Sequence, residues 1–177
     1  NIATKNTGGI LVFDLPSLPM QGGHNVRVFE NIVNDNSTPN FAPKGNIVAS
    51  VPTGTGVLVM ANRHVEIFDN VFDQNGTATV MIVGYRYEHK DPKYQPLPRH
   101  IVVRGNQQGK AGYAPKFPGG DQIAAAMGGS IPPVLWDGLS ESRDNALKIA
   151  PGVTGWSLNL SKVGQSLAEA QKLRDVA

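Results

Sequence analysis

The stretch Val26-Arg-Val-Phe-Glu-Asn31 indicates the fold most directly, because its pattern returns twice further along the chain. Val65-Glu-Ile-Phe-Asp-Asn70 and Ile101-Val-Val-Arg-Gly-Asn106 repeat it. In each copy, two apolar residues at a spacing of two lead to an asparagine three positions later. A spacing of two places both apolar side chains on one face of a β-strand. The repeat therefore predicts three equivalent strands, each ending at an asparagine.

A second set of strands carries a different apolar pattern, in Ile10-Leu-Val-Phe13, Val57-Leu-Val-Met60 and Val80-Met-Ile-Val83. The 23 positions from Val57 to Val80 (80 − 57) suit one coil of a β-solenoid. In such a fold, short strands bury their apolar sides by stacking on the next coil. A β-sandwich with recurring asparagine turns is the alternative, but equivalent motifs at matching strand ends favour the solenoid. We therefore predict an all-β chain folded as a right-handed parallel β-helix.

The asparagines that end the repeated strands are expected to stack at one corner of this helix. Asparagine tolerates the left-handed backbone angles of a tight corner. Its side-chain amide can also bond the equivalent residue on the next coil. We predict an asparagine ladder made of Asn31, Asn70 and Asn106.

The chain is expected to divide after residue 112. Residues 1–112 carry the predicted coils, interrupted by two long inter-coil loops at 36–55 and 85–98, and residues 113–177 form a Gly/Pro-rich tail packed on the solenoid. Two short helices are predicted inside this irregular tail. One covers Asp121 to Met127, and the other is an amphipathic helix from Ser161 to Val176.

The composition narrows the classes of function. The 177 residues carry a formal charge of +2 and no dense run of Lys or Arg, so nucleic acid is not an expected partner. No apolar stretch reaches the length of a membrane span. The absence of cysteine excludes disulfides, thiolate metal sites and a cysteine nucleophile. No metal-ligand spacing or cofactor motif is present, so we predict neither a metal nor a cofactor.

The outward positions of the second set of strands form what we call the apolar face. A polysaccharide groove with a calcium site needs carboxylates or a cation, and none stands at these positions. An exposed apolar surface is normally covered. We therefore expect the tail, or another protein, to lie over this face. Its residues are Leu11, Phe13, Leu58, Met60, Met81 and Val83.

Histidine and arginine recur at the corner where one set of strands passes to the next. One interpretation is an anion site for a uronate or a sulfated sugar, with a histidine as base. The simpler interpretation is that solvated polar residues end the strands there. No catalytic residue is identified. The candidate ligand-binding residues are His24, Arg63, His64, Arg99 and His100 at the corner, with Arg86 and His89 from the loop at 85–98.

The segment 9–106 resembles bacterial exported parallel β-helix repeat proteins related to the pectin-lyase-like superfamily, above all a group with tandem β-helix repeats. The phrases that carry the resemblance start at Gly8, Asn40, Gly56 and Pro133, and the last reads Pro-Val-Leu-Trp-Asp-Gly. The resemblance implies export to the periplasm or the cell exterior. It also implies a genetic pairing with a c-type dihaem cytochrome-like protein, and it supplies no established activity.

Three functions are therefore open. The first is an exported, non-catalytic scaffold used for protein–protein contact or self-association. The second is a carbohydrate-active protein, either a lyase, an epimerase or a binding module, that meets an acidic polysaccharide at the His/Arg corner. The third is a subunit serving a cytochrome, which rests on the resemblance because the chain has no Cys-x-x-Cys-His motif. The chain starts at Asn1 with no signal peptide, so a mature form and a piece of a longer protein are both open.

Overall fold

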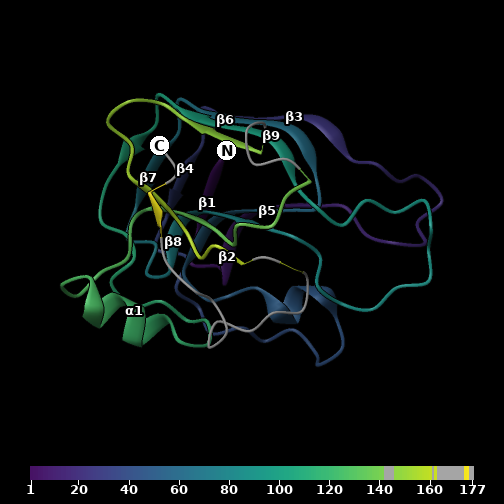
Figure 1. The fold of residues 1–177 in the computed structure, drawn as a ribbon. Coiled ribbons are helices and arrows are strands. Elements are labelled where there is room, and N and C mark those ends of the chain that lie inside the picture. Colours follow the sequence, from purple (N-terminus) through teal and green to yellow (C-terminus); the bar gives the residue numbers. More distant parts are fainter. Residues whose placement is uncertain (142–145, 161, 163–173, 176–177) are drawn as a thin grey trace.

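The chain folds as a parallel β-helix in which three sheets surround one interior, as a computed structural model shows (Figure 1). The structure describes residues 1–141, 146–160, 162 and 174–175. Between residues 2 and 149 the chain visits the three sheets in turn, so that each strand of this part pairs with the strand one coil away rather than with its neighbour in sequence. This arrangement confirms the predicted β-solenoid.

The bounds of the strands are as follows. The first sheet contains β1 (Ile2–Thr4), β4 (Ile32–Asn34), β7 (Val71–Asp73) and β10 (Gln107–Gln108). The second contains β2 (Gly8–Phe13), β5 (Thr55–Met60), β8 (Ala78–Val83), β11 (Val134–Trp136), β13 (Gly155–Ser157) and β14 (Arg174–Asp175). The third contains β3 (His24–Phe29), β6 (Arg63–Phe68), β9 (Arg99–Arg104) and β12 (Leu147–Ile149).

The pairing of the strands confirms the two predicted sets, which are the second and third sheets. Apolar residues at equivalent positions pair in register across neighbouring coils, and their side chains fill the interior. These residues become fully buried once a coil lies on both sides, as Val57 and Val65 show. The triplets in register are Ile10/Val57/Val80, Val12/Val59/Ile82, Val26/Val65/Ile101 and Val28/Ile67/Val103.

The asparagine ladder stands at the corner between the third and first sheets. The Asn31 Nδ2 donates to Asn70 Oδ1 at 2.9 Å, and the Asn70 Nδ2 donates to Asn106 Oδ1 at 2.9 Å. Asn1 extends the row, since its Nδ2 donates to Asn31 Oδ1 at 2.9 Å. These bonds satisfy polar groups that the tight corner would otherwise bury without partners.

A second asparagine ladder, which the sequence pattern did not reveal, lies at the corner between the first and second sheets. The Asn6 Nδ2 donates to Asn36 Oδ1, and the Asn36 Nδ2 donates to Asn75 Oδ1, both at 3.2 Å. Asn36 and Asn75 are fully buried. Two corners of the helix are therefore held by stacked side-chain amides.

Segments of the chain itself cover the apolar face of the second sheet. Leu58 and Met81 are buried in a cluster with Val51, which precedes β5. The same cluster contains Ala124 and Ile131, which follow β10. The cover therefore comes from the loop at 36–55 and from residues beyond 112.

The loop at 85–98 covers the rest of the apolar face. Met60 is buried against Tyr94, and Phe13 and Val83 are partly buried beside them. Leu11 stays exposed on the outermost strand. The described part of the chain thus provides the cover that the sequence predicted. This face consequently gives no support for a protein partner.

The stacking of strands continues beyond residue 112, into the segment 113–177 that was predicted as a tail on the coils at 1–112. β11 pairs in parallel with β8, β12 with β9, and β13 with β11. Trp136 is buried in the interior among the core residues of the earlier coils. The segment after residue 112 is therefore partly a shortened continuation of the solenoid.

The two predicted helices have different outcomes. Helix α1 (Gly120–Ala126) confirms the one expected at 121–127. The amphipathic helix expected at 161–176 lies largely outside the described residues. Residues 174–175 are described, and they form β14, which pairs antiparallel with β13. The helical prediction is therefore wrong at that end. No helix among the described residues is long and apolar enough to cross a membrane.

Candidate functional site

A pocket forms where corners of different length stack between the second and third sheets. The corner after β5 consists of residues 61–62 alone, whereas the corners after β2 and β8 span 14–23 and 84–98. The short corner lies between the two long ones. The long corners form the walls of a pocket of about 790 Å³, which we call the corner pocket. Its lining residues are Asp14, Ser17, Leu18, Pro19, Gln21, Gly22, Gly23, Ala61, Arg63, Asp91, Pro92, Lys93, Gln95, Leu97 and Arg99.

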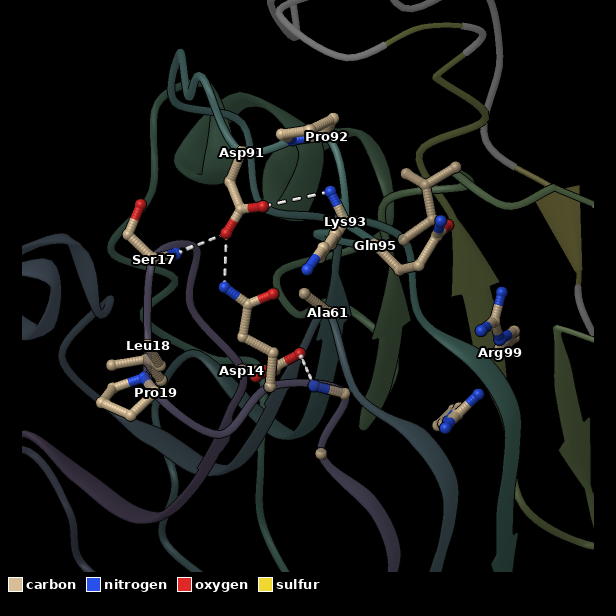
Figure 2. Close-up of a pocket in the computed structure, with 15 residues that line it drawn as sticks. Asp14, Ser17, Leu18, Pro19, Ala61, Asp91, Pro92, Lys93, Gln95 and Arg99 are labelled. Atoms are coloured by element: carbon tan, nitrogen blue, oxygen red, sulfur yellow. Dashed lines mark hydrogen bonds between the residues drawn. The ribbon is translucent and has the colours of Figure 1, made fainter.

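Asp91 ties the two walls of the corner pocket together (Figure 2). Its Oδ2 accepts hydrogen bonds from the Ser17 backbone N at 2.8 Å and from the Gln21 side chain. Its Oδ1 accepts from the Lys93 backbone N at 3.0 Å. The Gln21 side chain, followed by the two backbone donors, lowers the pKa of Asp91. Asp91 is therefore ionised at neutral pH and holds the two loops together.

Asp14 and Tyr94 anchor the base of the same walls. The buried Asp14 carboxylate accepts from the Gly22 backbone N at 3.0 Å, and the Tyr94 hydroxyl donates to the Asp14 carbonyl at 2.7 Å. Burial first, and then the charge of Asp14, raises the pKa of Tyr94. The tyrosine therefore stays protonated and keeps donating this bond at any ordinary pH.

The cations of the corner pocket are Arg63, Lys93 and Arg99. Arg63 and Arg99 occupy equivalent positions on neighbouring strands, because β6 pairs with β9 in register. The Arg99 Nη1 lies 3.1 Å from Glu141 Oε2. Arg63 makes no ion pair with a carboxylate of the described residues, and its buried Nε has no hydrogen-bond partner there. The Arg63 guanidinium group is therefore available to bind an anion in the pocket.

The predicted corner histidines lie beside the corner pocket and do not line it. His24 is in register with Arg63, so His64 and His100 follow at the next equivalent position, where Asn25 stands in the first coil. The rings of His64 and His100 stack with centroids 4.5 Å apart and planes 6° from parallel. Burial and then the charge of His100 lower the pKa of His64. The neutral form of the His64 ring is thus favoured at this edge.

The left-handed backbone of these corner residues is a property of the corner itself. Asn25, His64 and His100 have φ of 56°, 51° and 56°. Because all three coils share this conformation, it marks the bend into the third sheet and not a site strained for chemistry. The repeated histidines are therefore explained in part by the geometry of the corner.

Arg86 and His89, which were predicted to join the site, lie outside the corner-pocket lining. Both are exposed. The His89 ring packs edge-on against Tyr85 and Tyr94, with centroids 5.9 and 5.0 Å away. Arg86 instead acts by its charge on the buried Asp137. Of the seven predicted site residues, the pocket therefore brings together only Arg63 and Arg99.

Asp137 is a buried carboxyl group behind the loop at 85–98. Its Oδ2 accepts from the Gly84 backbone N at 2.7 Å, and its Oδ1 accepts from the Leu139 backbone N at 2.9 Å. Burial raises its pKa to about 6, against the opposing effects of these two bonds and of Arg86. Asp137 has a structural role, because it closes the turn after β11.

Sequence reasoning missed Asp14, Gln21, Asp91 and Lys93, which complete the walls of the corner pocket. A usable signal was present in the spacing of the strand motifs. The two sets of repeated apolar residues are almost adjacent in one coil, from Met60 to Val65, whereas long insertions separate them in the coils before and after. Comparing these spacings would have located a gap in the stack.

Comparisons of the chain with protein-family models, with curated proteins and with solved structures gave no match. Within the described residues, no group of three or more His, Asp or Glu side chains is arranged to hold a metal ion. The geometry of the corner pocket is therefore the basis for the functional argument.

Proposed function

We propose that this chain is an exported, non-catalytic parallel β-helix that binds an acidic sugar unit in the corner pocket. The observation that carries the proposal is the pair of arginines, Arg63 and Arg99, that stand in register on the pocket lining. A guanidinium group presents its donors in a planar fork that matches a carboxylate or a sulfate. Neighbouring strands lie about 4.8 Å apart, so two such groups at paired positions favour an anion between or beside them.

The three cations of the pocket lining, Arg63, Lys93 and Arg99, outnumber its two carboxylates. Asp14 and Asp91 already accept hydrogen bonds from the loops, which disperse their charge. The amide of Gln95 is a suitable partner for sugar hydroxyl groups at the same wall. A ligand with one acidic group and several hydroxyl groups therefore fits the chemistry of the lining better than a purely apolar ligand.

Binding without catalysis is the reading that the lining supports. Proton abstraction beside a uronate needs a base poised near neutral pH. None of the described lining residues is a histidine, and the lowered pKa makes Asp91 a weak base. The arginines would thus hold the ligand without a histidine on the pocket lining to remove its proton.

Calorimetric titration with trigalacturonate, with neutral cellotriose as comparison, tests the proposal. The wild-type chain is expected to bind only the acidic sugar. Arg63→Gln is expected to raise Kd about tenfold or more, since a hydrogen bond to a charged group contributes about 1.5–3 kcal/mol. Lys93→Gln, at an exposed position, is expected to weaken binding less.

Arg27→Gln is the matched control, because Arg27 is exposed on the same sheet but does not line the pocket. Its Kd should stay within about twofold of the wild type. Equal binding of both sugars, or equal Kd values for Arg63→Gln and Arg27→Gln, would show that the pocket is not the site. Thermal unfolding of each variant checks that the fold is retained.

A second candidate function, protein contact by a scaffold, is favoured by the outer side of the first sheet. Ile2, Ile32 and Val71 stand in register there and are 72%, 43% and 38% exposed. Ile32→Asp should then abolish any self-association seen by light scattering.

Native purification with a haem absorbance readout tests the predicted c-type cytochrome partner.

The predicted relation to exported β-helix proteins of the pectin-lyase-like superfamily belongs to the same proposal, as does a periplasmic or extracellular location. The parallel β-helix architecture supports that relation at the level of fold. Fractionation of cells that express the full natural gene product tests the location directly. Recovery in the cytoplasm alone would contradict it.

A further inference from the structure

Glu141 holds one of the two arginines of the corner pocket. Its Oε2 lies 3.1 Å from the Arg99 Nη1, and the side chains of Arg99 and Glu141 are 26% and 53% exposed. Glu141 itself is not part of the pocket lining. It reaches Arg99 from the connection between β11 and β12, whereas Arg99 begins β9. Arg99, which lines the cavity (Figure 2), therefore carries a carboxylate partner from outside the lining.

The equivalent arginine of the preceding coil lacks such a partner. Arg63 is in register with Arg99, yet no described carboxylate lies within ion-pair distance of it. Two guanidinium groups on adjacent strands repel each other, and a single carboxylate on one of them relieves only part of this repulsion. An anion that contacted both arginines would relieve more of it.

We infer that the Glu141 carboxylate stands in for the acidic group of the ligand, and that the ligand displaces it from Arg99 on binding. This inference rests on the proposed function of the corner pocket. Glu141 lowers the affinity for acidic ligands, because each binding event must break its ion pair with Arg99. It also raises selectivity, since a neutral sugar cannot replace a carboxylate on a guanidinium group. Glu141 is thus a specificity-determining residue outside the lining.

The test compares Glu141→Gln with the wild type by calorimetry, using trigalacturonate and inorganic sulfate as probes at low ionic strength. The variant is expected to bind both anions about two- to fivefold more tightly, the range set by an exposed ion pair. In Arg99→Gln, the further change Glu141→Gln is expected to have no effect on Kd, because the ion pair is already lost.

Glu66→Gln is the matched control. Glu66 pairs with Arg104 at 3.4 Å on the same sheet, with side chains 45% and 47% exposed, and neither residue lines the pocket. Glu66→Gln removes one negative charge, as Glu141→Gln does, but at an ion pair that does not involve a lining residue. It should therefore leave both Kd values unchanged. Equal tightening in Glu66→Gln and Glu141→Gln would reveal a general charge effect and overturn the inference.

The remaining outcomes separate the inference from the proposed function. If the wild type binds trigalacturonate and Glu141→Gln binds it with the same Kd, the inference is wrong and the proposed function stands. If neither protein binds trigalacturonate but the variant binds sulfate more tightly than the wild type, the displacement holds and the sugar assignment is wrong. Binding of neither probe by either protein overturns both.

Discussion

Asn70 stands in the middle of the first asparagine ladder and is bonded on both sides. Its Oδ1 accepts from the Asn31 backbone N at 3.1 Å and from the Asn31 side chain, while its Nδ2 donates to Asn106 and to the Val28 carbonyl. All of these groups lie at a corner that excludes water from Asn70 entirely. A side chain without an amide would leave several of them buried and unbonded.

Asn70→Ala is therefore expected to lower the free energy of unfolding by roughly 3 kcal/mol or more, as an unsatisfied buried polar group costs about 1–3 kcal/mol. Urea denaturation measures the change. Asn106→Ala is the control, because Asn106 is only half-buried and follows Asn70 in the ladder. It should destabilise less. Equal and small effects at both positions would contradict a ladder that stabilises the coils.

Asp137 makes the free energy of unfolding depend on pH. The sign of this dependence is opposite to that for most aspartates, whose pKa is lowered in the folded state. Burial raises its pKa from 3.8 to about 6. The folded state therefore holds the proton more tightly than the unfolded chain. The stabilising contribution is full below about pH 4 and is lost as the pH rises to about 6, by up to about 3 kcal/mol in total.

Urea denaturation at pH 4.5 and pH 7.5 measures this loss, and Asp137→Asn isolates it. The variant cannot ionise, so its stability should fall less between these pH values than that of the wild type. Its stability at pH 4.5 should already be lower, because an amide nitrogen cannot accept the bond from Gly84 or Leu139. Identical pH dependence in both proteins would contradict the raised pKa.

At the scale of elements, the loop at 85–98 is held in place by a small number of bonds. Asp91 is its contact with the loop at 14–23, and Tyr94 is its contact with the apolar face. Because the described loop has no strand of its own, these contacts determine where its Lys93 and Gln95 stand in the corner pocket.

Asp91→Ala is expected to speed amide hydrogen exchange at Ser17 and Lys93, which both donate to the Asp91 carboxylate. Exchange within β5 and β6 should not change, since their backbone bonds belong to the solenoid. Glu88→Ala, at an exposed carboxylate in the same loop, serves as the control. Faster exchange in both variants, or in neither, would show that the Asp91 carboxylate does not hold the two loops together. Acidification below the lowered pKa of Asp91 should mimic the Ala variant.

The strands of the second and third sheets could be predicted because each carries two inward apolar residues with a readable spacing, as Val65 and Ile67 do. The strands of the first sheet could not be predicted from the sequence. Each has three residues or fewer, with a single inward side chain such as Val33 or Phe72. One residue has no period, so those strands are defined by stacking alone. The strands β11, β12 and β13 are also only three residues long, which is too short for a period of two to stand out from the sequence.

At the scale of the whole molecule, the site is a consequence of stacking coils with unequal corners. Arg63 and Arg99 could be singled out from the sequence because they precede repeated strands. Asp14, Asp91 and Lys93 could not, because loops that lie far apart in the chain meet only when their coils are adjacent. The apolar face shows the same limit, since the sequence led us to expect the tail or another protein as its cover, whereas the loops at 36–55 and 85–98 contribute to it as well.

A chemical-shift titration of the ¹⁵N-labelled chain with trigalacturonate tests the central claim most directly, because it reports where an acidic sugar binds. The structure leads us to expect saturable shifts at the amides of 14–23, 61–63 and 91–99 and at the Nε–H groups of Arg63 and Arg99. The outer side of the first sheet, at Ile32 and Val71, should not respond. Saturable shifts confined to the first sheet, or no shifts at all, would contradict a corner pocket that binds an acidic sugar.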